Sequence, residues 1–488
     1  MVDLPPEIWL RVMQFIPHSD LRDNLWTVNG LFLDIAMNLR WRQVLIMTRN
    51  TGASMHILER LMDPFVAKRV RYLILRLTHV KDPYAEPLSN TNKPLRQIQQ
   101  TFKRVFAANK DTATFKRPHP LSTFSEVMDT LVRTAPNFTH VRELNIDCWD
   151  LPPSYDLQPL FASIWATFGP HLEGLVLGGN VEGYRDFIMS KPSLPRVREL
   201  QLELTNNLFK PGQRGDSDLE KLRVWSWALL DVSGFFGLLS QGNFPILQAL
   251  NVRMAFDKSL HDPSGLKALL LQCSSTMESL ELRLNPSGLP MNPASEQPLS
   301  LWLAECARED GCLARLRYLD IYPTSMASGF DALLTSIERT EASLVELIVR
   351  DRYLLPTEAK IVVDAVSQCE NLKYLRMNIW RLDVELIDHL AEKVPNISRL
   401  WISIGDTATN ANATGGIAET FLQDLQGRWY TKWKLKDITI WQGGQEIDED
   451  IMHALARSIP SIDSFFGNGH MHREDPSTSA LPKVPVGR

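Results

Sequence analysis

The side chains that could perform catalysis or bind a metal are dispersed along this chain. Among eleven histidines only His470 and His472 lie close together, and two histidines alone make a weak metal site. Cys306 and Cys312 flank two acidic residues, but their separation does not match the spacing of zinc ligands. We therefore interpret the histidine pair as a surface feature and expect no metal site.

Familiar catalytic motifs are also missing from the sequence. It has no G-x-S-x-G nucleophile elbow, no H-E-x-x-H pair and no G-x-x-x-x-G-K-[ST] phosphate loop. The glycine-containing stretch GDTATNANATGG, which starts at Gly405, has no lysine, so an insertion loop after a strand explains it better than a phosphate site. We expect no cofactor and no enzyme activity. An unrecognised active site is the alternative.

Composition and charge indicate a globular protein without a polyanionic ligand. Hydrophobic residues make up 44% of the 488 residues and charged residues 22%, which is an ordinary globular balance. The 52 basic and 57 acidic residues nearly cancel, which argues against nucleic acid or an anionic membrane as partner. Five scattered cysteines and the lack of a signal peptide or a long apolar run favour reduced thiols and a cytoplasmic and/or nuclear location.

An internal repeat covers most of the chain. Its pattern is an apolar residue, two variable residues, leucine, a variable residue and another apolar residue. The copies are centred on Leu73, Leu144, Leu175, Leu200, Trp225, Leu250, Leu280, Leu319, Leu347, Leu375, Leu400 and Ile438. Three consecutive separations are 25 residues, and most of the others lie in or near the leucine-rich-repeat range of about 20–29 residues.

Apolar periodicity changes between the copies and the segments that connect them. Each copy alternates apolar and variable residues, as a strand with one buried face does. The connecting segments have helical spacing, as in three apolar sets: Ile361, Val362, Ala365 and Val366; Ile387, Leu390 and Val394; Ile451, Leu455 and Ile459. We predict an α/β leucine-rich-repeat solenoid, a curved parallel sheet with helices outside. A doubly wound sheet would need longer apolar strands and a glycine-rich first turn.

The repeat divides the chain into three parts. Residues 1–48 form a helical segment, residues 49–466 an irregular solenoid, and residues 467–488 a tail too polar to pack, which we expect to be disordered. Five prolines interrupt the repeat at about 80–122, where we expect an insertion of two loops around one helix.

The N-terminal segment carries more apolar surface than about 40 residues can bury internally. Ile8, Val12, Phe15 and Ile16 form one helical face, and Pro17 ends that helix. A second apolar set follows, made of Leu21, Leu25, Val28, Phe32, Ile35 and Ala36. Either a partner or the first repeat must cover these side chains.

This segment resembles an F-box. The matching residues, in order, are Leu4, Pro5, Glu7, Ile8, Val12, Ile16, Pro17, Asp20, Leu21, Val28, Asn29 and Phe32. One residue is inserted between Leu21 and Val28, and Gly30 replaces the usual basic residue, which puts adaptor binding in question. As a whole, the chain is similar to fungal F-box-like proteins with degenerate leucine-rich repeats.

The resemblance implies a non-catalytic substrate-recognition subunit of an SCF-type cullin–RING ubiquitin ligase. Docking to a Skp-type adaptor, and through it to a cullin, would then involve Leu4, Pro5, Ile8, Val12, Ile16, Leu21, Leu25 and Val28. One alternative is that residues 4–44 only cap the solenoid. Another is an interaction scaffold that acts outside any ligase.

The variable positions of each copy point from the open face of the predicted sheet. Late copies place residue types there that are enriched at binding hot spots. We expect an unknown protein substrate to contact Arg350, Tyr374, Arg376, Arg399, Trp401 and Trp441. Acidic residues are interleaved with them, which favours a protein ligand over nucleic acid. Alternatively, these arginines and acids satisfy each other, and the tryptophans cover the sheet.

Overall fold

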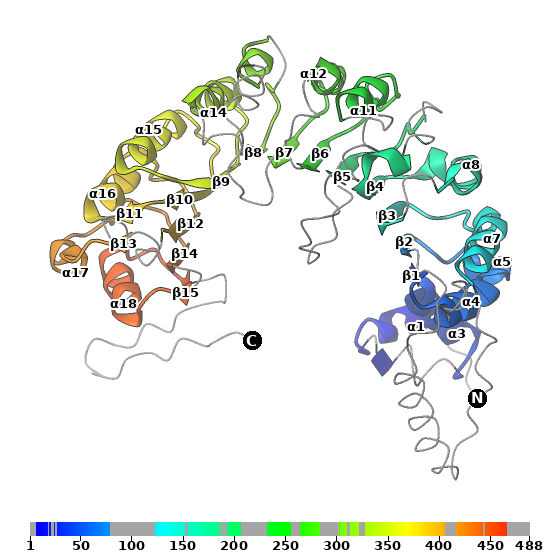
Figure 1. Ribbon diagram of the computed structural model, residues 1–488. Helices are drawn as coiled ribbons and strands as arrows, with labels where there is room; N and C mark the ends of the chain where they lie inside the picture. Colours follow the sequence, from blue (N-terminus) through cyan, green and yellow to red (C-terminus); the bar gives the residue numbers. More distant parts are fainter. Residues whose placement is uncertain are drawn as a thin grey trace, which may run out of the picture. The chain divides into compact units, whose positions relative to one another are not determined.

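Strands and helices alternate along the chain in the computed structural model (Figure 1). The structure describes residues 6–17, 19–20, 24, 27–78, 123–151, 155–184, 187, 193–205, 232–254, 264–283, 301, 303–309, 313–321, 327–405, 416–442 and 445–465. They belong to two compact units, divided within the strand Gly174–Asn180. The expected insertion at 80–122, the expected tail at 467–488 and the copy centred on Trp225 lie outside the described residues.

The first unit starts with helices and continues with parallel strands. Its helices are α1 (Pro6–Met13), α3 (Gly30–Trp41), α4 (Thr51–Leu61), α5 (Pro64–Ala67), α7 (Phe124–Thr134) and α8 (Gln158–Thr167), with 3-10 turns at Ala135–Asn137, Gly169–His171 and Val181–Tyr184. Its strands are β1 (Gln43–Met47), β2 (Tyr72–Thr78) and β3 (Glu143–Asp150), followed by β4 (Gly174–Asn180) at the division. Strand β1, which the repeat pattern missed, pairs in parallel with β2 and places Val44 opposite Leu73.

The second unit is a longer run of strand–helix repeats. Its main strands are β5 (Glu199–Thr205), β6 (Ala249–Met254), β7 (Ser279–Arg283), β8 (Tyr318–Ile321), β9 (Glu346–Leu354), β10 (Tyr374–Ile379), β12 (Arg399–Ile404) and β14 (Asp437–Gln442), paired in chain order and all in parallel. Short strands are β11 (Arg381–Leu382), β13 (Gly416–Ile417), β15 (Gln445–Glu446) and β16 (Ser464–Phe465). Its helices are α11 (Val232–Leu239), α12 (Ser264–Gln272), α14 (Ala327–Thr340), α15 (Pro356–Val366), α16 (Val384–Lys393), α17 (Phe421–Leu425) and α18 (Glu449–Ser458).

The central residues of the repeat lie in register across the sheet of the second unit. In chain order they are Leu200, Leu250, Leu280, Leu319, Leu347, Leu375, Leu400 and Ile438. Each is at most 2% exposed. Burying each such side chain contributes roughly 1.5–3 kcal/mol, so the stacked leucines form the core between sheet and helices. The solenoid predicted from the repeat is confirmed.

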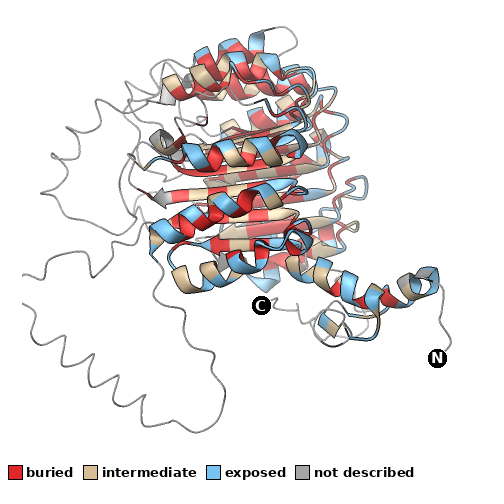
Figure 2. Ribbon diagram, turned by 90° about the vertical axis from the view of Figure 1, so that its right-hand side faces the viewer, coloured by how far each residue is buried: buried red, intermediate tan, exposed pale blue. Residues whose placement is uncertain are grey.

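The helices bury one side against the strands and expose the other (Figure 2). On α16 and α18 and at the residues directly after them, the predicted apolar side chains are buried: Ile387, Leu390, Val394, Ile451, Leu455 and Ile459. On α15 the predicted face is partly wrong. Val362 and Val366 are buried as expected, but Val363 and Ala359 complete the buried side, and Ile361 is 45% exposed. Ile361 and Val362 are adjacent and both apolar, so spacing alone did not tell which of the two faces the sheet.

Two glycines allow a close helix contact in the second unit. A Cβ atom added at Gly265 of α12 would lie 2.3 Å from the backbone nitrogen of Gly237 on α11. Any side chain at this position would therefore push the two helices apart. The described cysteines Cys148, Cys273, Cys306 and Cys369 are buried, reduced thiols, as expected.

Candidate functional site

Helix α1 has two apolar faces. The inner face packs on α3 in a small cluster that contains the buried Met13 and Phe32 together with partly buried Trp9 and Ile16. The rings of Trp9 and Phe32 meet edge to face with centroids 5.4 Å apart. Asn29 caps α3, because its side-chain oxygen accepts a hydrogen bond from the backbone N–H of Phe32 at 3.0 Å. The two helices are thus held together by their own small core.

The outer face of α1 is apolar and exposed. Ile8 is 46% exposed and Val12 40%. Phe15, in the turn that directly follows α1 and extends this face, is 82% exposed, and Val28 in the turn before α3 is 51% exposed. The predicted single face that joined Ile16 to these residues is therefore wrong, since Ile16 belongs to the inner cluster. An exposed apolar face of this kind is typical of an interaction site.

The adaptor-binding residues predicted from the F-box resemblance are placed only in part. The side chains of Ile8, Val12 and Val28 are exposed, and that of Ile16 is half-buried. Leu4, Pro5, Leu21 and Leu25 lie outside the described residues. Phe15, which was not among the predicted contacts, is the most exposed large apolar side chain of the described chain.

Arg69 ties α3 to the first repeat of the solenoid. Its guanidinium is buried and forms an ion pair with Asp34 at 2.6 Å. It also donates hydrogen bonds to the Asn38 side chain at 2.6 Å, to the Asp34 carbonyl at 3.1 Å and to the Phe65 carbonyl at 3.2 Å. The Phe65 ring lies 4.3 Å from the guanidinium carbon. The N-terminal helices are therefore anchored to the solenoid by a fully engaged buried arginine.

The open face of the sheet in the second unit carries a charge cluster at its centre, formed by Glu281, Asp320, Arg253, Arg283 and Arg350. Glu281 of β7 and Asp320 of β8 are opposite each other in register and are 6% and 0% exposed. Arg350 lies 2.8 Å from Asp320 and 3.7 Å from Glu281, and Arg253 lies 3.2 Å from Glu281. Arg283 pairs with both acids. Arg253 also lies 3.2 Å from Glu203, so the three arginines face three acidic side chains.

Burial sets the protonation of this cluster. It raises the pKa of Asp320 to about 7, Arg283 acts in the opposite direction, and Glu281 adds a smaller increase. Burial also raises the pKa of the neighbouring Tyr318, so its hydroxyl stays protonated at neutral pH. These shifts arise from the sheet's own packing.

Beyond the charge cluster, the open face becomes aromatic. In register, Arg376 of β10 lies beside Trp401 of β12, and the guanidinium carbon is 4.4 Å from the indole centroid. Trp401 and Trp441 stack nearly parallel, with centroids 6.5 Å apart. Arg399 stacks on Tyr374 at 4.8 Å.

Of the six predicted substrate contacts, five gather in this aromatic region. They are Tyr374, Arg376, Arg399, Trp401 and Trp441. Arg350 instead belongs to the charge cluster, where it pairs with buried acids. Sequence reasoning missed the anchoring role of Arg69, because its partner Asp34 is distant in sequence and no motif links them.

The described part of the chain shows no group of three or more histidine, cysteine or acidic side chains arranged to hold a metal. Within the same residues, no helix is both long and apolar enough to cross a bilayer.

Comparison with known proteins found no matching family model and no matching curated protein. Among solved structures, the chain is similar to a Bacteroides fragilis protein at 14% identity, covering 63% of this chain and 81% of that one, with a TM-score of 0.33. It is also similar to a chain of the Rad7 and Elc1 complex in yeast at 15% identity, covering 86% and 96%, again with a TM-score of 0.33. Likenesses this distant carry no argument about function.

Proposed function

We propose that this protein is a non-catalytic substrate-recognition subunit of an SCF-type cullin–RING ubiquitin ligase, acting in the cytoplasm and/or nucleus. In this proposal the N-terminal helices dock to a Skp-type adaptor, and the repeats bind a protein substrate. The observation that carries it is the exposed apolar surface of Ile8 and Val12 on α1 and of Phe15 in the turn that follows, while the opposite face of α1 is already packed.

A rigid apolar face supports docking for a physical reason. The inner cluster with Phe32 fixes α1, and Arg69 fixes α3, so little conformational entropy is lost when a partner binds the outer face. Burying an exposed aliphatic or aromatic side chain against a partner contributes roughly 1.5–3 kcal/mol. The F-box resemblance supports a Skp-type adaptor as the partner, since its pattern includes Ile8 and Val12.

The aromatic region of the open face supports the second half of the proposal. Tryptophan, tyrosine and arginine are the types that dominate binding hot spots, and Tyr374, Arg376 and Trp401 combine them on adjacent strands. Acidic and basic side chains alternate nearby, as in the pair of Arg399 with Glu346 at 3.0 Å. A mixed surface of this kind suits a protein substrate better than nucleic acid.

A second candidate is an interaction scaffold that never joins a ligase, with the N-terminal helices serving as a cap. The contacts of Arg69 favour it, because they bind α3 tightly to the first repeat. Under this reading the outer face of α1 binds no adaptor.

Affinity purification of the tagged full chain from eukaryotic cells, followed by mass spectrometry, tests the proposal. We expect a Skp-type adaptor and a cullin among the recovered proteins, and their loss with Leu4→Ala plus Pro5→Ala. A folded wild-type chain that recovers no such adaptor contradicts the proposal and leaves the scaffold.

A further inference from the structure

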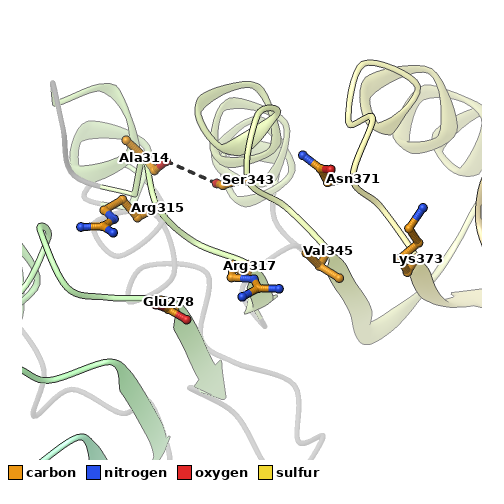
Figure 3. A pocket seen from close by; sticks show the side chains of 8 residues that line it. All are labelled: Glu278, Ala314, Arg315, Arg317, Ser343, Val345, Asn371 and Lys373. Carbon is orange, nitrogen blue, oxygen red and sulfur yellow. Dashed lines mark hydrogen bonds between the residues drawn. The ribbon is translucent and has the colours of Figure 1, made fainter.

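A polar groove runs along the rim of the second unit where strands begin. We call it the rim groove and define it by Glu278, Arg315, Arg317, Ser343, Asn371 and Lys373 (Figure 3). Its volume is about 590 Å³. Glu278, Arg317 and Lys373 directly precede β7, β8 and β10, so the groove crosses the starts of neighbouring strands rather than the open face.

The sheet fixes the spacing of the groove's cations. The backbone N–H of Arg317 donates to the Glu278 carbonyl at 2.7 Å, and that of Lys373 donates to the Val345 carbonyl at 2.8 Å. Val345 in turn donates to the Arg317 carbonyl at 2.8 Å. Neighbouring strands lie about 4.8 Å apart, so the backbones of Arg317 and Lys373, two strands apart, are separated by about 10 Å.

Side-chain hydrogen bonds to the backbone stiffen the wall of the groove. The Ser343 hydroxyl donates to the Leu316 carbonyl at 2.7 Å, and the Asn371 amide donates to the Ala342 carbonyl at 2.9 Å. Arg315 donates to the Ser275 carbonyl at 2.6 Å. The loops that carry the cations are therefore tied to one another before any ligand arrives.

The charges of the groove differ from those of the open face. Across the described residues, Arg317 and Lys373 are exposed and enter no ion pair, whereas Arg253, Arg283 and Arg350 each pair with a buried acid. Glu278 is the single acid among the residues that line the groove, against three cations. The rim groove thus keeps an uncompensated positive charge.

We propose that the rim groove binds an acidic, extended segment of a protein partner, with carboxylates facing Arg317 and Lys373. This inference rests on the proposed function and names the chemistry of the protein that the repeats hold. In an extended chain of the polyproline II type, acidic residues three positions apart project from the same side and are about 9 Å apart, which is close to the spacing of the two cations. Nucleic acid fits less well, because the whole chain is acidic, with a net charge of −5.

Fluorescence anisotropy with the full chain tests this site. The probe is a labelled peptide of Glu-Gly-Gly repeats, and the same peptide with lysine in place of glutamate is the control ligand. We expect the glutamate peptide to bind, to weaken as salt rises, and to bind about tenfold less tightly to Arg317→Glu plus Lys373→Glu. Arg60→Glu, which changes an exposed cation of α4 outside the groove, should leave binding unchanged.

Three results would overturn the inference: no binding of the glutamate peptide, equal binding to the doubly substituted chain, or tighter binding of a single-stranded oligonucleotide of the same charge. Arg317→Gln plus Lys373→Gln repeats the test without charge reversal if the first variant does not fold. Measuring adaptor binding with the same preparations distinguishes failure of the rim-groove inference from failure of the proposed function. A chain that binds the adaptor but not the peptide refutes only the rim groove, and one that binds no adaptor refutes the proposed function.

Discussion

Ile8 and Val12 of α1 and Phe15 in the turn after it are exposed, although the opposite side of the helix is packed. On the open face of the second unit, Glu281 and Asp320 are buried beneath three arginines. Within the described chain, the apolar side chains of the first surface remain exposed, whereas the charged side chains of the second surface pair with one another. A partner of α1 therefore gains apolar burial directly, but a partner at the charge cluster must compete with ion pairs that already exist.

This difference assigns separate roles to the two surfaces. Apolar burial supplies affinity, and charged groups held in fixed positions supply selectivity more than affinity. Between these extremes lies the aromatic region, where Arg376 and Trp401 are half-buried and engaged with each other but still reach solvent. Four experiments test this contrast.

The largest effect is expected for Ile8→Asp plus Val12→Asp. Charges on the exposed face of α1 should weaken adaptor binding by roughly 1,000-fold or more, because two hot-spot positions contribute about 2 kcal/mol each. Isothermal titration with a purified Skp-type adaptor measures this. Ile361→Asp plus Leu422→Asp is a matched control, since these residues are 45% and 40% exposed, against 46% and 40% for Ile8 and Val12. Equal losses in both variants would refute a specific face.

A second effect concerns pH and the buried Asp320. Its pKa is about 7 in the folded chain and 3.8 as an ordinary value, so the folded state holds an extra proton between these limits. The contribution of Asp320 to the free energy of unfolding should therefore fall as pH rises from about 4 to about 7, by about 4 kcal/mol in total. Above about pH 7 it should stay constant. Urea unfolding at several pH values measures it.

Asp320→Asn is the control for that titration. The amide retains the shape of the side chain and one acceptor oxygen but does not ionise, so the fall in the free energy of unfolding over this pH range should shrink. An unchanged pH dependence in the variant would assign the titration to other groups.

A third, smaller effect is expected for Arg69→Ala. Loss of the ion pair with Asp34 and of the bond to Asn38 should cost roughly 1.5–3 kcal/mol and release α3 from the first repeat. Limited proteolysis should then cut near residues 27–42 faster than in the wild type, while fragments of the second unit remain intact. Unchanged cleavage would show that α3 is held by its apolar contacts alone.

The smallest effect is the coupling between Arg376 and Trp401. A double-mutant cycle with alanine at each position should give about 0.5–1 kcal/mol of coupling in the free energy of unfolding, as for partly exposed cation–π pairs. A coupling near zero would mean that the guanidinium does not interact with the ring in solution and is free for a ligand.

Sequence reasoning succeeded where periodicity decides the structure. The alternation around Leu250, Leu280 and Leu319 fixes which side of each strand is buried, and the strands stack these residues in register. It missed β1, because Val44 stands where the repeat has leucine. It misplaced Ile361 and Ile16, since two adjacent apolar residues leave the direction of burial open.

The candidate sites were less predictable than the fold. The positions of Tyr374, Arg376 and Trp401 on the open face follow from alternation, but their mutual stacking depends on strand register. The contacts of Arg69 join residues far apart in the sequence, which no local pattern encodes. The rim groove is formed by residues that precede neighbouring strands and by the loops between them, and their convergence depends on how the repeats stack.

Hydrogen exchange of the full chain, with and without a purified Skp-type adaptor, tests the central claim most directly. The account predicts slower amide exchange across residues 6–16 when the adaptor is present, because binding on the outer face of α1 suppresses opening of that helix. Peptides from β10 and β12 should be unaffected. Unchanged exchange in residues 6–16 at saturating adaptor would contradict the account.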